Sequence, residues 1–514
     1  MRIKDAPLLP SGAVGRSLLR VAVAVAFTAG LAAAAGAQLE PTQLSDLRAT
    51  GGLIEDVQTV ADGAFTLYTA DSNRVNRREL WSLDNTDGTA RKLNVELDPA
   101  EQVWDFWPSP SGDRVVYLVT APAPGLFRGF FAVDVAGGPS VPISGTLPPS
   151  PEILDDVRWT ADGSRVVYGH RLVVSDPVHL LSSTADGAPP VVISGPIVDG
   201  GDVRGFDVAV NSVVFWGNLQ DQNQHRVYST SAAGGPRTEL GATLPSDAFV
   251  KFARILRPDG APPLVLVVSK EASDELYTTP VAGGALTQLP KAQPFRLISD
   301  NGEPIRFVPS ANRIVYETSW ERVLSQSLDG GAPVDMGSAS NPFEIVKWDL
   351  TIDQARVLVL ERENNVSALY STPIAGGTPL KISSDQPSGT RIQHFTVGPD
   401  PDRFLYLADD RMQNRTELFV SSTTAVDATR LSPIDFAGRS GTFHLNYFFT
   451  ADGSRAIYIA DQLELGVHEL FSVPLDGGPS TRLSGPLPFD ADIWHVHPGP
   501  DDAHVFYTGS QNLL

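Results

Sequence analysis

The chain repeats one short phrase at a regular interval. "WTADGSRVVYGH" begins at Trp159, and "FTADGSRAIYIA", which begins at Phe449, uses nearly the same letters. The same order, a turn followed by a β-branched run that ends in an aromatic residue, recurs throughout the chain. These turns lie at Asp62, Ser111, Asp162, Asn211, Asp259, Ala311, Asp353, Pro401, Asp452 and Asp501. Their mean spacing of about 49 residues indicates an architecture built from repeats of that length.

Each repeat carries further phrases that predict four strands. The first strand precedes the turn, as in "DDVRW" (155–159), and the Asp-Gly pair supplies the positive φ of a tight hairpin. The second strand, "RVVY" (165–168), is apolar on both faces, so we expect it between two neighbouring layers. The third ends in a small-residue turn, as in "ELFSVPLDGG" (469–478). The fourth, such as "TRLS" (481–484), is short and polar, which suits an outer edge.

One such sheet cannot bury both of its faces alone, whereas sheets arranged radially cover one another. The sequence therefore predicts an all-β fold, a β-propeller of four-stranded antiparallel blades, with nine full repeats and a C-terminal half repeat. The segment "TQLSDL" (42–47) echoes a fourth strand and suggests that the N-terminal part completes the last blade. We favour one large ring. Two smaller propellers, or a chain cut short in mid-blade, are the alternatives.

The repeat resembles a known family. The pattern of "WTADGSRVVY" followed by phrases such as "ALYSTPIAGG" (368–377) is similar to the TolB-like, WD40-like (PD40-type) propeller repeats of exported bacterial proteins, over about residues 50 to 509. The resemblance implies a propeller that works in the periplasm and, in TolB itself, binds a peptidoglycan-associated lipoprotein. This chain departs from TolB because it has no α/β domain ahead of the repeats and has more than six of them.

The first 37 residues predict a secretory signal peptide. Arg16 and Arg20 precede an apolar run from Val21 to Ala35, and a small-x-small site ends at Ala37. We expect cleavage after Ala37, propeller repeats over 38–514, and a periplasmic or secreted protein. A membrane anchor is the alternative, but the run is short for a span of about 20 apolar residues.

The composition excludes some partners. The formal net charge is −21 at pH 7, and nucleic-acid affinity depends on Lys and Arg that neutralise phosphates. We therefore expect no nucleic acid, no membrane span after cleavage, and a monomer. The chain has no cysteine, so packing and strand pairing alone must stabilise it.

The motifs of known chemistry are mostly absent from the sequence. No G-x-S-x-G elbow of a serine hydrolase occurs, and "DNTDG" (84–88) lacks the distal Glu of a calcium loop, so we interpret it as a β-turn. His495 and His497 are two residues apart on one strand, and His444 lies in a first strand of the preceding repeat. These three are weak candidates for metal ligands. We expect no cofactor.

The first strands are the best place to look for a ligand site, because in a propeller they line the central channel. Their polar positions alternate with apolar ones, so we expect the polar face to look into the channel or its mouth. Mixed charges that converge on a cavity suit a ligand site, although any solvated channel shows them too. The candidates are Asp56, Asp156, Arg158, Arg204, Arg306, Lys347, Asp349, His394 and Asn446.

Two functions follow from these features. The first is an exported binding or scaffold module of the cell envelope, which engages a protein or a peptidoglycan-associated partner through its loop faces or channel. The alternative is a propeller enzyme, a lyase or hydrolase that acts on a glycan or lactone with His and Asp at the channel mouth.

Overall fold

The structure is a computed structural model, and it describes strand Val25–Ala26 and most of the chain from 54 to 509. Within that stretch it leaves out residues 72–76, 121–126, 145–152, 172–175, 241–243, 245–248, 271–272, 292–295, 298–304, 320–321, 339–343, 364–365, 384–389, 411–414, 433–442, 465, 486, 488–492 and 499–503. Some strand residues are described by their backbone alone, and among them are Asp156, His444, His495 and His497. Statements about side chains below concern the others.

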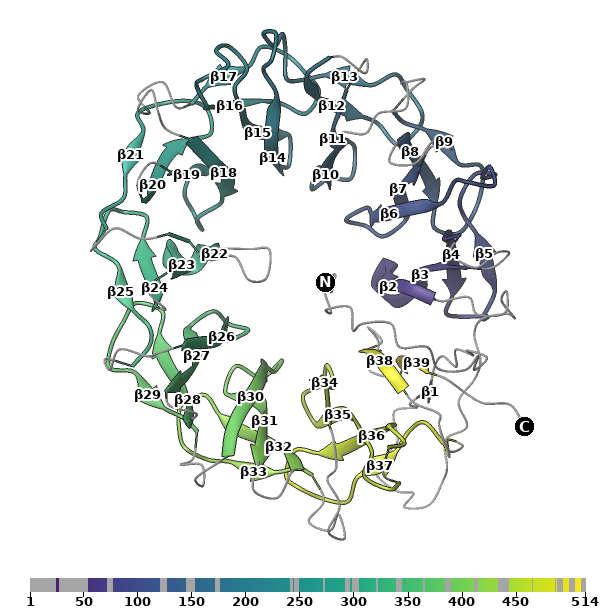
Figure 1. The fold of residues 1–514 in the computed structure, drawn as a ribbon, viewed down its shortest axis with the longest axis vertical. Coiled ribbons are helices and arrows are strands. Elements are labelled where there is room, and N and C mark those ends of the chain that lie inside the picture. Colours follow the sequence, from purple (N-terminus) through teal and green to yellow (C-terminus); the bar gives the residue numbers. More distant parts are fainter. Residues whose placement is uncertain are drawn as a thin grey trace.

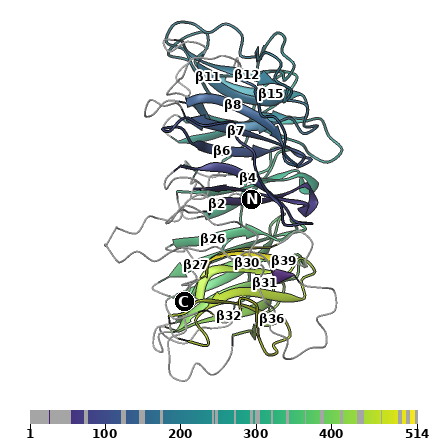
Figure 2. The ribbon, with the colours of Figure 1, turned by 90° about the vertical axis from the view of Figure 1, so that its right-hand side faces the viewer.

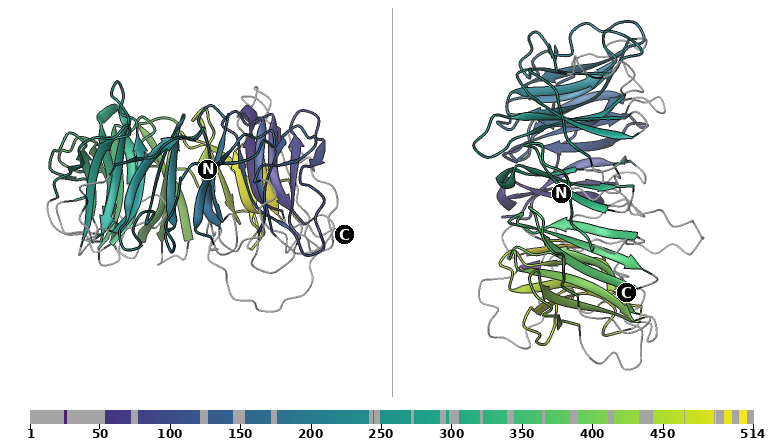
Figure 3. Two further views of the ribbon diagram at one scale, coloured as in Figure 1. Left: turned by 90° about the horizontal axis from the view of Figure 1, so that it is seen from above. Right: turned by 90° about the vertical axis from the view of Figure 1, so that its left-hand side faces the viewer.

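Nine four-stranded antiparallel sheets and one smaller sheet stand around a common axis and form a single ring (Figure 1). We call each sheet a blade and number the blades one to ten in chain order. The strands run roughly along the axis, and loops lie on the two flat faces of the disc (Figures 2 and 3). The described residues contain two short 3-10 turns, η1 (Ala61–Gly63) and η2 (Pro309–Ala311), and no α-helix. The β-propeller prediction is therefore confirmed.

The strands of each blade follow one another outward from the axis. The inner strands are β2 (Ile54–Val60), β6 (Val103–Pro108), β10 (Ile153–Trp159), β14 (Val203–Ala209), β18 (Phe249–Leu256), β22 (Ile305–Val308), β26 (Glu344–Leu350), β30 (Thr390–Val397), β34 (Phe443–Phe449) and β38 (Ile493–Pro498). The second strands are β3 (Phe65–Ala70), β7 (Arg114–Thr120), β11 (Val166–Arg171), β15 (Ser212–Gly217), β19 (Leu264–Lys270), β23 (Arg313–Thr318), β27 (Arg356–Glu363), β31 (Arg403–Asp410), β35 (Arg455–Ala460) and β39 (His504–Gly509).

The outer half of each full blade is made by a third strand and a very short fourth strand. The third strands are β4 (Glu79–Asp84), β8 (Phe127–Asp134), β12 (Val178–Ser183), β16 (Arg226–Ser231), β20 (Asp274–Pro280), β24 (Arg322–Ser327), β28 (Val366–Pro373), β32 (Arg415–Ser422) and β36 (Glu469–Pro474). The fourth strands are β5 (Ala90–Lys92), β9 (Val141–Pro142), β13 (Val191–Val192), β17 (Thr238–Glu239), β21 (Thr287–Gln288), β25 (Val334–Asp335), β29 (Leu380–Lys381), β33 (Thr429–Arg430) and β37 (Thr481–Arg482).

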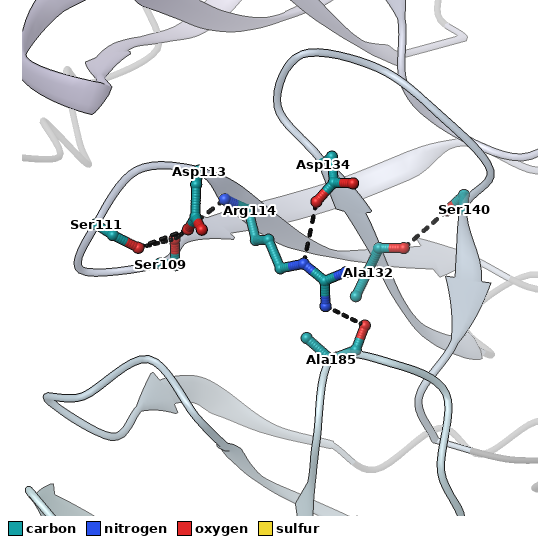
Figure 4. A network of polar contacts seen from close by, with 8 residues as sticks. All are labelled: Ser109, Ser111, Asp113, Arg114, Ala132, Asp134, Ser140 and Ala185. Carbon is teal, nitrogen blue, oxygen red and sulfur yellow. Dashed lines mark hydrogen bonds and ion pairs between the residues drawn. The ribbon is translucent and has the colours of Figure 1, made fainter.

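The repeated turn is held by the side chains that recur in the sequence. Asp162 Oδ1 accepts hydrogen bonds from Thr160 Oγ1 (2.6 Å) and from the backbone N–H of Ser164 (3.0 Å), and Gly163 takes a φ of 67°. Blade two makes the same kind of turn with Asp113, and Arg114 after it donates to Ala185 O of blade three at 2.8 Å (Figure 4). The repeated Asp-Gly segment therefore fixes the turn, and the arginine after it in blade two forms a hydrogen bond to the neighbouring blade.

The hydrophobic core lies between the blades. Val166, Val167 and Tyr168 of the second strand β11 have no exposed surface, so this strand is covered on both faces, as the sequence predicts. Val166 and Tyr168 pack with Val116 and Phe130 of blade two, whereas Val167 packs with blade four. The hydroxyl of Tyr168 donates to Ile143 O of blade two at 3.1 Å. Each blade is therefore stabilised by both of its neighbours.

The last blade lies beside the first and completes the ring (Figure 1). It contains β38 and β39, and β1 (Val25–Ala26) pairs antiparallel with β39 through Val25–Val505 and Ala26–His504. An N-terminal segment thus joins the C-terminal sheet, although the expected segment 42–47 lies outside the described residues. Because β1 falls within the predicted signal peptide, cleavage after Ala37 would remove it and leave the edge of β39 for another strand.

Candidate functional site

Two arginine–aspartate pairs join neighbouring inner strands. Arg158 on β10 pairs with Asp207 on β14, and Arg306 on β22 pairs with Asp349 on β26. Each aspartate also accepts the backbone N–H of the residue after it, from Val208 at 3.0 Å and from Leu350 at 2.8 Å. The same contact therefore occurs twice, between blades three and four and between blades six and seven.

Asp207 connects three blades. Its Oδ1 receives Arg158 from blade three, and its Oδ2 accepts the backbone N–H of Ile255 on β18 of blade five at 2.7 Å. Its side chain is 9% exposed, so this carboxylate is nearly shielded from water. A buried carboxylate requires paired charge and hydrogen bonds, and Asp207 has both.

A second chain of polar contacts crosses blades seven, eight and nine. Lys347 Nζ on β26 donates to His394 Nε2 on β30 (2.8 Å) and to Phe395 O (2.8 Å). His394 Nδ1 lies 2.9 Å from the hydroxyl of Tyr447 on β34. Because the Lys347 ammonium only donates, Nε2 of a neutral imidazole must accept, and Nδ1–H then donates to Tyr447. Together with Arg306 and Asp349, these residues form what we call the inner-strand cluster.

Burial changes the protonation of this cluster. Burial, reinforced by the charge of Lys347, lowers the pKa of His394 to about 3. Burial also lowers the pKa of Lys347 to about 8, with Asp349 opposing and Arg306 assisting that change. Burial raises the pKa of Tyr447 well above its usual value. At neutral pH the cluster therefore holds a neutral imidazole next to an amine that loses its proton unusually easily.

Aromatic side chains flank both cations. The Arg306 guanidinium lies 5.1 Å from the centre of the Trp348 ring, and Lys347 Nζ lies 5.2 Å from that of Phe395. The indole N–H of Trp348 donates to Glu317 Oε2 at 3.1 Å. Cation–π contacts of this kind help to fix the positions of the Arg306 guanidinium and the Lys347 ammonium against the aromatic rings.

The other predicted residues lie outside this cluster or next to it. Arg204 is 52% exposed and lies 3.9 Å from Asp202. Asp56 is exposed at a bulge of β2, where it approaches Arg78 at 3.8 Å. Asn446 is half-buried beside Tyr447 on β34. The side chain of Asp156 lies outside the described residues.

The described polar side chains of this cluster and of the Arg158–Asp207 pair contact neighbouring blades. An inner strand runs along the axis, so its side chains alternate between the two faces of its own sheet, and each face lies against another blade. The candidates chosen from the sequence included neither Asp207 nor Tyr447. Asp207 could have been found, because it holds the position in β14 that Asp349 holds in β26.

The weak metal candidates cannot be placed. The side chains of His444, His495 and His497 lie outside the described residues, and among those described no group of three His, Cys, Asp or Glu residues is arranged to hold a metal ion. The segment "DNTDG" forms a turn, in which Asp84 Oδ1 accepts Thr86 N at 3.0 Å and Gly88 N donates to Asp84 O at 2.8 Å. The segment is therefore a turn, as interpreted, although the bond from Gly88 to Asp84 spans one residue more than that of a β-turn.

The comparisons with known proteins concern the fold alone. No protein-family model matches the sequence, and no curated protein matches it. The structure is similar to that of Porphyromonas gingivalis dipeptidyl peptidase 4, with a TM-score of 0.48 and 11% identity over 78% of this chain and 64% of that chain. It is also similar to prolyl oligopeptidase B from Galerina marginata, with a TM-score of 0.38 and 10% identity over 80% of this chain and 55% of that one.

A third similar structure is that of the tricorn protease, with a TM-score of 0.31 and 13% identity over 91% of this chain and 44% of that one. The matches thus span between 44% and 64% of the lengths of these three proteins. In the described residues, no helix is long and apolar enough to cross a lipid bilayer.

Acid should reveal the neutral state of His394. Because the folded pKa is lowered from 6.5 to about 3, the unfolded chain takes up the proton first, and stability falls as pH drops through this window. The free energy of unfolding of the wild type, measured relative to His394→Gln, should fall by about 1–2 kcal/mol between pH 7 and pH 4, a value reduced because the ring is only half-buried. Urea titrations at each pH measure this. Parallel curves for the two proteins would show that His394 has an ordinary pKa.

Proposed function

We propose that this protein is an exported binding module of the cell envelope, TolB-like in its repeats, which engages a protein or peptidoglycan-associated partner. The observation that carries the proposal is the inner-strand cluster, which links polar side chains of four consecutive blades next to the ring axis. The predicted signal peptide supports export. Blades that stabilise one another on both sides form a rigid frame, and such a frame suits a surface that binds without changing shape.

The electrostatics favour a partner with a negatively charged group. The chain as a whole is strongly acidic, with a net charge of −21, yet Arg306 and Lys347 place two cations on adjacent inner strands. Arg306 is paired with Asp349, whereas Lys347 is bonded to a neutral ring and a carbonyl oxygen. A carboxylate of a peptide or of the cell wall could therefore pair with the Lys347 ammonium, although the net negative charge of the chain repels anions.

Binding can be tested with two lysine variants that lose the same charge. Lys347→Gln removes the inner-strand ammonium, whereas Lys381→Gln removes one from the fourth strand β29 at the outer edge. The wild type and Lys381→Gln should capture the same partner from envelope extracts, or sediment equally with purified peptidoglycan. Lys347→Gln should capture at least tenfold less. Equal capture by all three proteins would remove the inner strands from the proposal, and no capture by the wild type would refute it altogether.

The Lys347–His394 contact also favours a second candidate, the glycan or lactone enzyme. Proton abstraction needs a base whose pKa lies near the working pH and a second group within hydrogen-bond reach, and this pair provides both. Under this candidate the purified protein should turn over polyuronates or lactones, and His394→Gln should abolish turnover. A folded wild type without activity on these substrates would exclude it.

A further inference from the structure

Lys347 differs from Lys92, Lys251 and Lys291 in what its amine contacts. Lys92 lies 3.5 Å from Glu79, and Lys251 and Lys291 are ion-paired with Asp274 and Glu275. Lys347 Nζ donates instead to an imidazole nitrogen and a backbone carbonyl, and among the described residues no carboxylate lies within ion-pair distance of it. Nothing in this arrangement holds the proton on Lys347 as strongly as a carboxylate would.

The groups around Lys347 favour loss of that proton to the solvent and leave a proton acceptor beside the amine. From β22, Arg306 adds positive charge, and on its own strand Asp349, which opposes this, is itself paired with Arg306. From β30, Nε2 of His394 has a lone pair directed at the amine. From β34, the Tyr447 hydroxyl keeps the other ring nitrogen protonated.

We propose that Lys347 is a nucleophilic amine that captures an aldehyde or ketone as an imine, with His394 moving the proton. An unprotonated lysine next to a proton acceptor and another cation is the arrangement that imine formation requires. Lys347 is half-buried, so the residue is not fully shielded from solvent. This inference goes beyond partner binding and does not depend on it.

The reaction balances without any further reagent. The amine nitrogen attacks the carbonyl carbon, a C–N bond forms, and the π electron pair of the carbonyl moves to its oxygen. His394 Nε2 takes one proton from the nitrogen and delivers it to that oxygen, which gives a carbinolamine. The carbinolamine loses its hydroxyl group and the second nitrogen proton as water while the C=N bond forms. Tyr447 is a positioning residue, because it contacts only the ring of His394.

The chain contains its own matched control. Lys251 on the inner strand β18 is half-buried like Lys347, but it is paired with the buried carboxylate of Asp274. The full-length protein is treated at pH 7 with propionaldehyde and cyanoborohydride, which fixes each imine as an N-propyl group. The chain has seven lysines, so peptide mapping by mass spectrometry gives a separate rate for each site that the digest covers.

We expect Lys347 to be modified at least tenfold faster than Lys251. A pKa of about 8 leaves about a tenth of an amine unprotonated at pH 7, against fewer than about one in a thousand for an ordinary lysine. An equal or lower rate at Lys347 than at Lys251 would overturn the proposal. Both rates are measured on the wild-type chain, so the comparison does not depend on whether a variant folds.

The role of His394 has its own test. In His394→Gln an amide oxygen can still accept from Lys347, but it cannot take up the proton, so the rate at Lys347 should fall at least tenfold while Lys251 is unchanged. Tyr447→Phe should slow Lys347 less, because the imidazole stays in place. If His394→Gln leaves the rate and its pH profile at Lys347 unchanged, the proton transfer is refuted. None of these outcomes depends on whether an envelope partner is captured.

Discussion

Asp207→Ala is expected to destabilise the fold by about 3 kcal/mol, because it removes one partner of a nearly buried ion pair. The change leaves the Arg158 guanidinium without its carboxylate and the backbone N–H of Ile255 without its acceptor. The effect should therefore reach blades three and five, although the substitution is in blade four. Urea unfolding followed by tryptophan fluorescence measures the loss of free energy.

Two controls separate this contact from the general effect of removing an aspartate. Asp134→Ala breaks the pair of Asp134 with Arg114, whose side chains are 55% and 36% exposed, and should cost less than about 1 kcal/mol. Asp207→Asn keeps oxygen and shape, so its cost should lie between the other two. Equal losses for Asp207→Ala and Asp134→Ala would show that the inner-strand pair does not join the blades.

Phe395→Ala is expected to cost about 3–5 kcal/mol, which is the usual loss for a large aromatic residue removed from a core. Phe395 has no exposed surface and packs in one cluster with Leu358 and Leu360 of blade seven and with Phe404 of its own blade. The cavity would therefore open at the interface between two blades.

The same variant, Phe395→Ala, should raise the pKa of His394, because water would reach the neighbouring ring. NMR titration of the imidazole measures this rise.

An exposed residue on a third strand provides the comparison. Val366 on β28 is 59% exposed, so Val366→Ala should change the free energy of unfolding by less than about 0.5 kcal/mol. If Phe395→Ala were as mild as Val366→Ala, the packing of one blade against the next would not be the source of stability.

The sequence predicts the elements within a blade, because their signals are local. The turn at Asp162, the twice-covered strand after it and the short outer strand near Thr481 all follow from a few neighbouring residues. Contacts between blades are different, because they join residues far apart in the chain. Arg158 and Asp207 are 49 residues apart, and Lys347 and His394 are 47 apart. Repeat alignment places such residues on equivalent strands but does not show which side chains meet.

Closure of the ring was the least predictable feature. The echo between "TQLSDL" (42–47) and the fourth strands predicted that this N-terminal segment completes the last blade. The structure pairs β1 with β39, and segment 42–47 lies outside the described residues. Any extended apolar segment can pair with an open sheet edge through its backbone, so sequence pattern specifies such a pairing weakly. If the predicted cleavage after Ala37 occurs, it removes β1, and another segment would have to pair with β39.

The number and closure of the blades can be counted directly by cryo-electron microscopy of the full-length protein, in views down the short axis of the particle. Each blade buries its two faces against its neighbours. These views should therefore show ten blades around one axis, with no gap between the last blade and the first. Two smaller propellers, or an open arc with an exposed sheet face at each end, would contradict the mutual burial of the blades on which the site and both proposals rest.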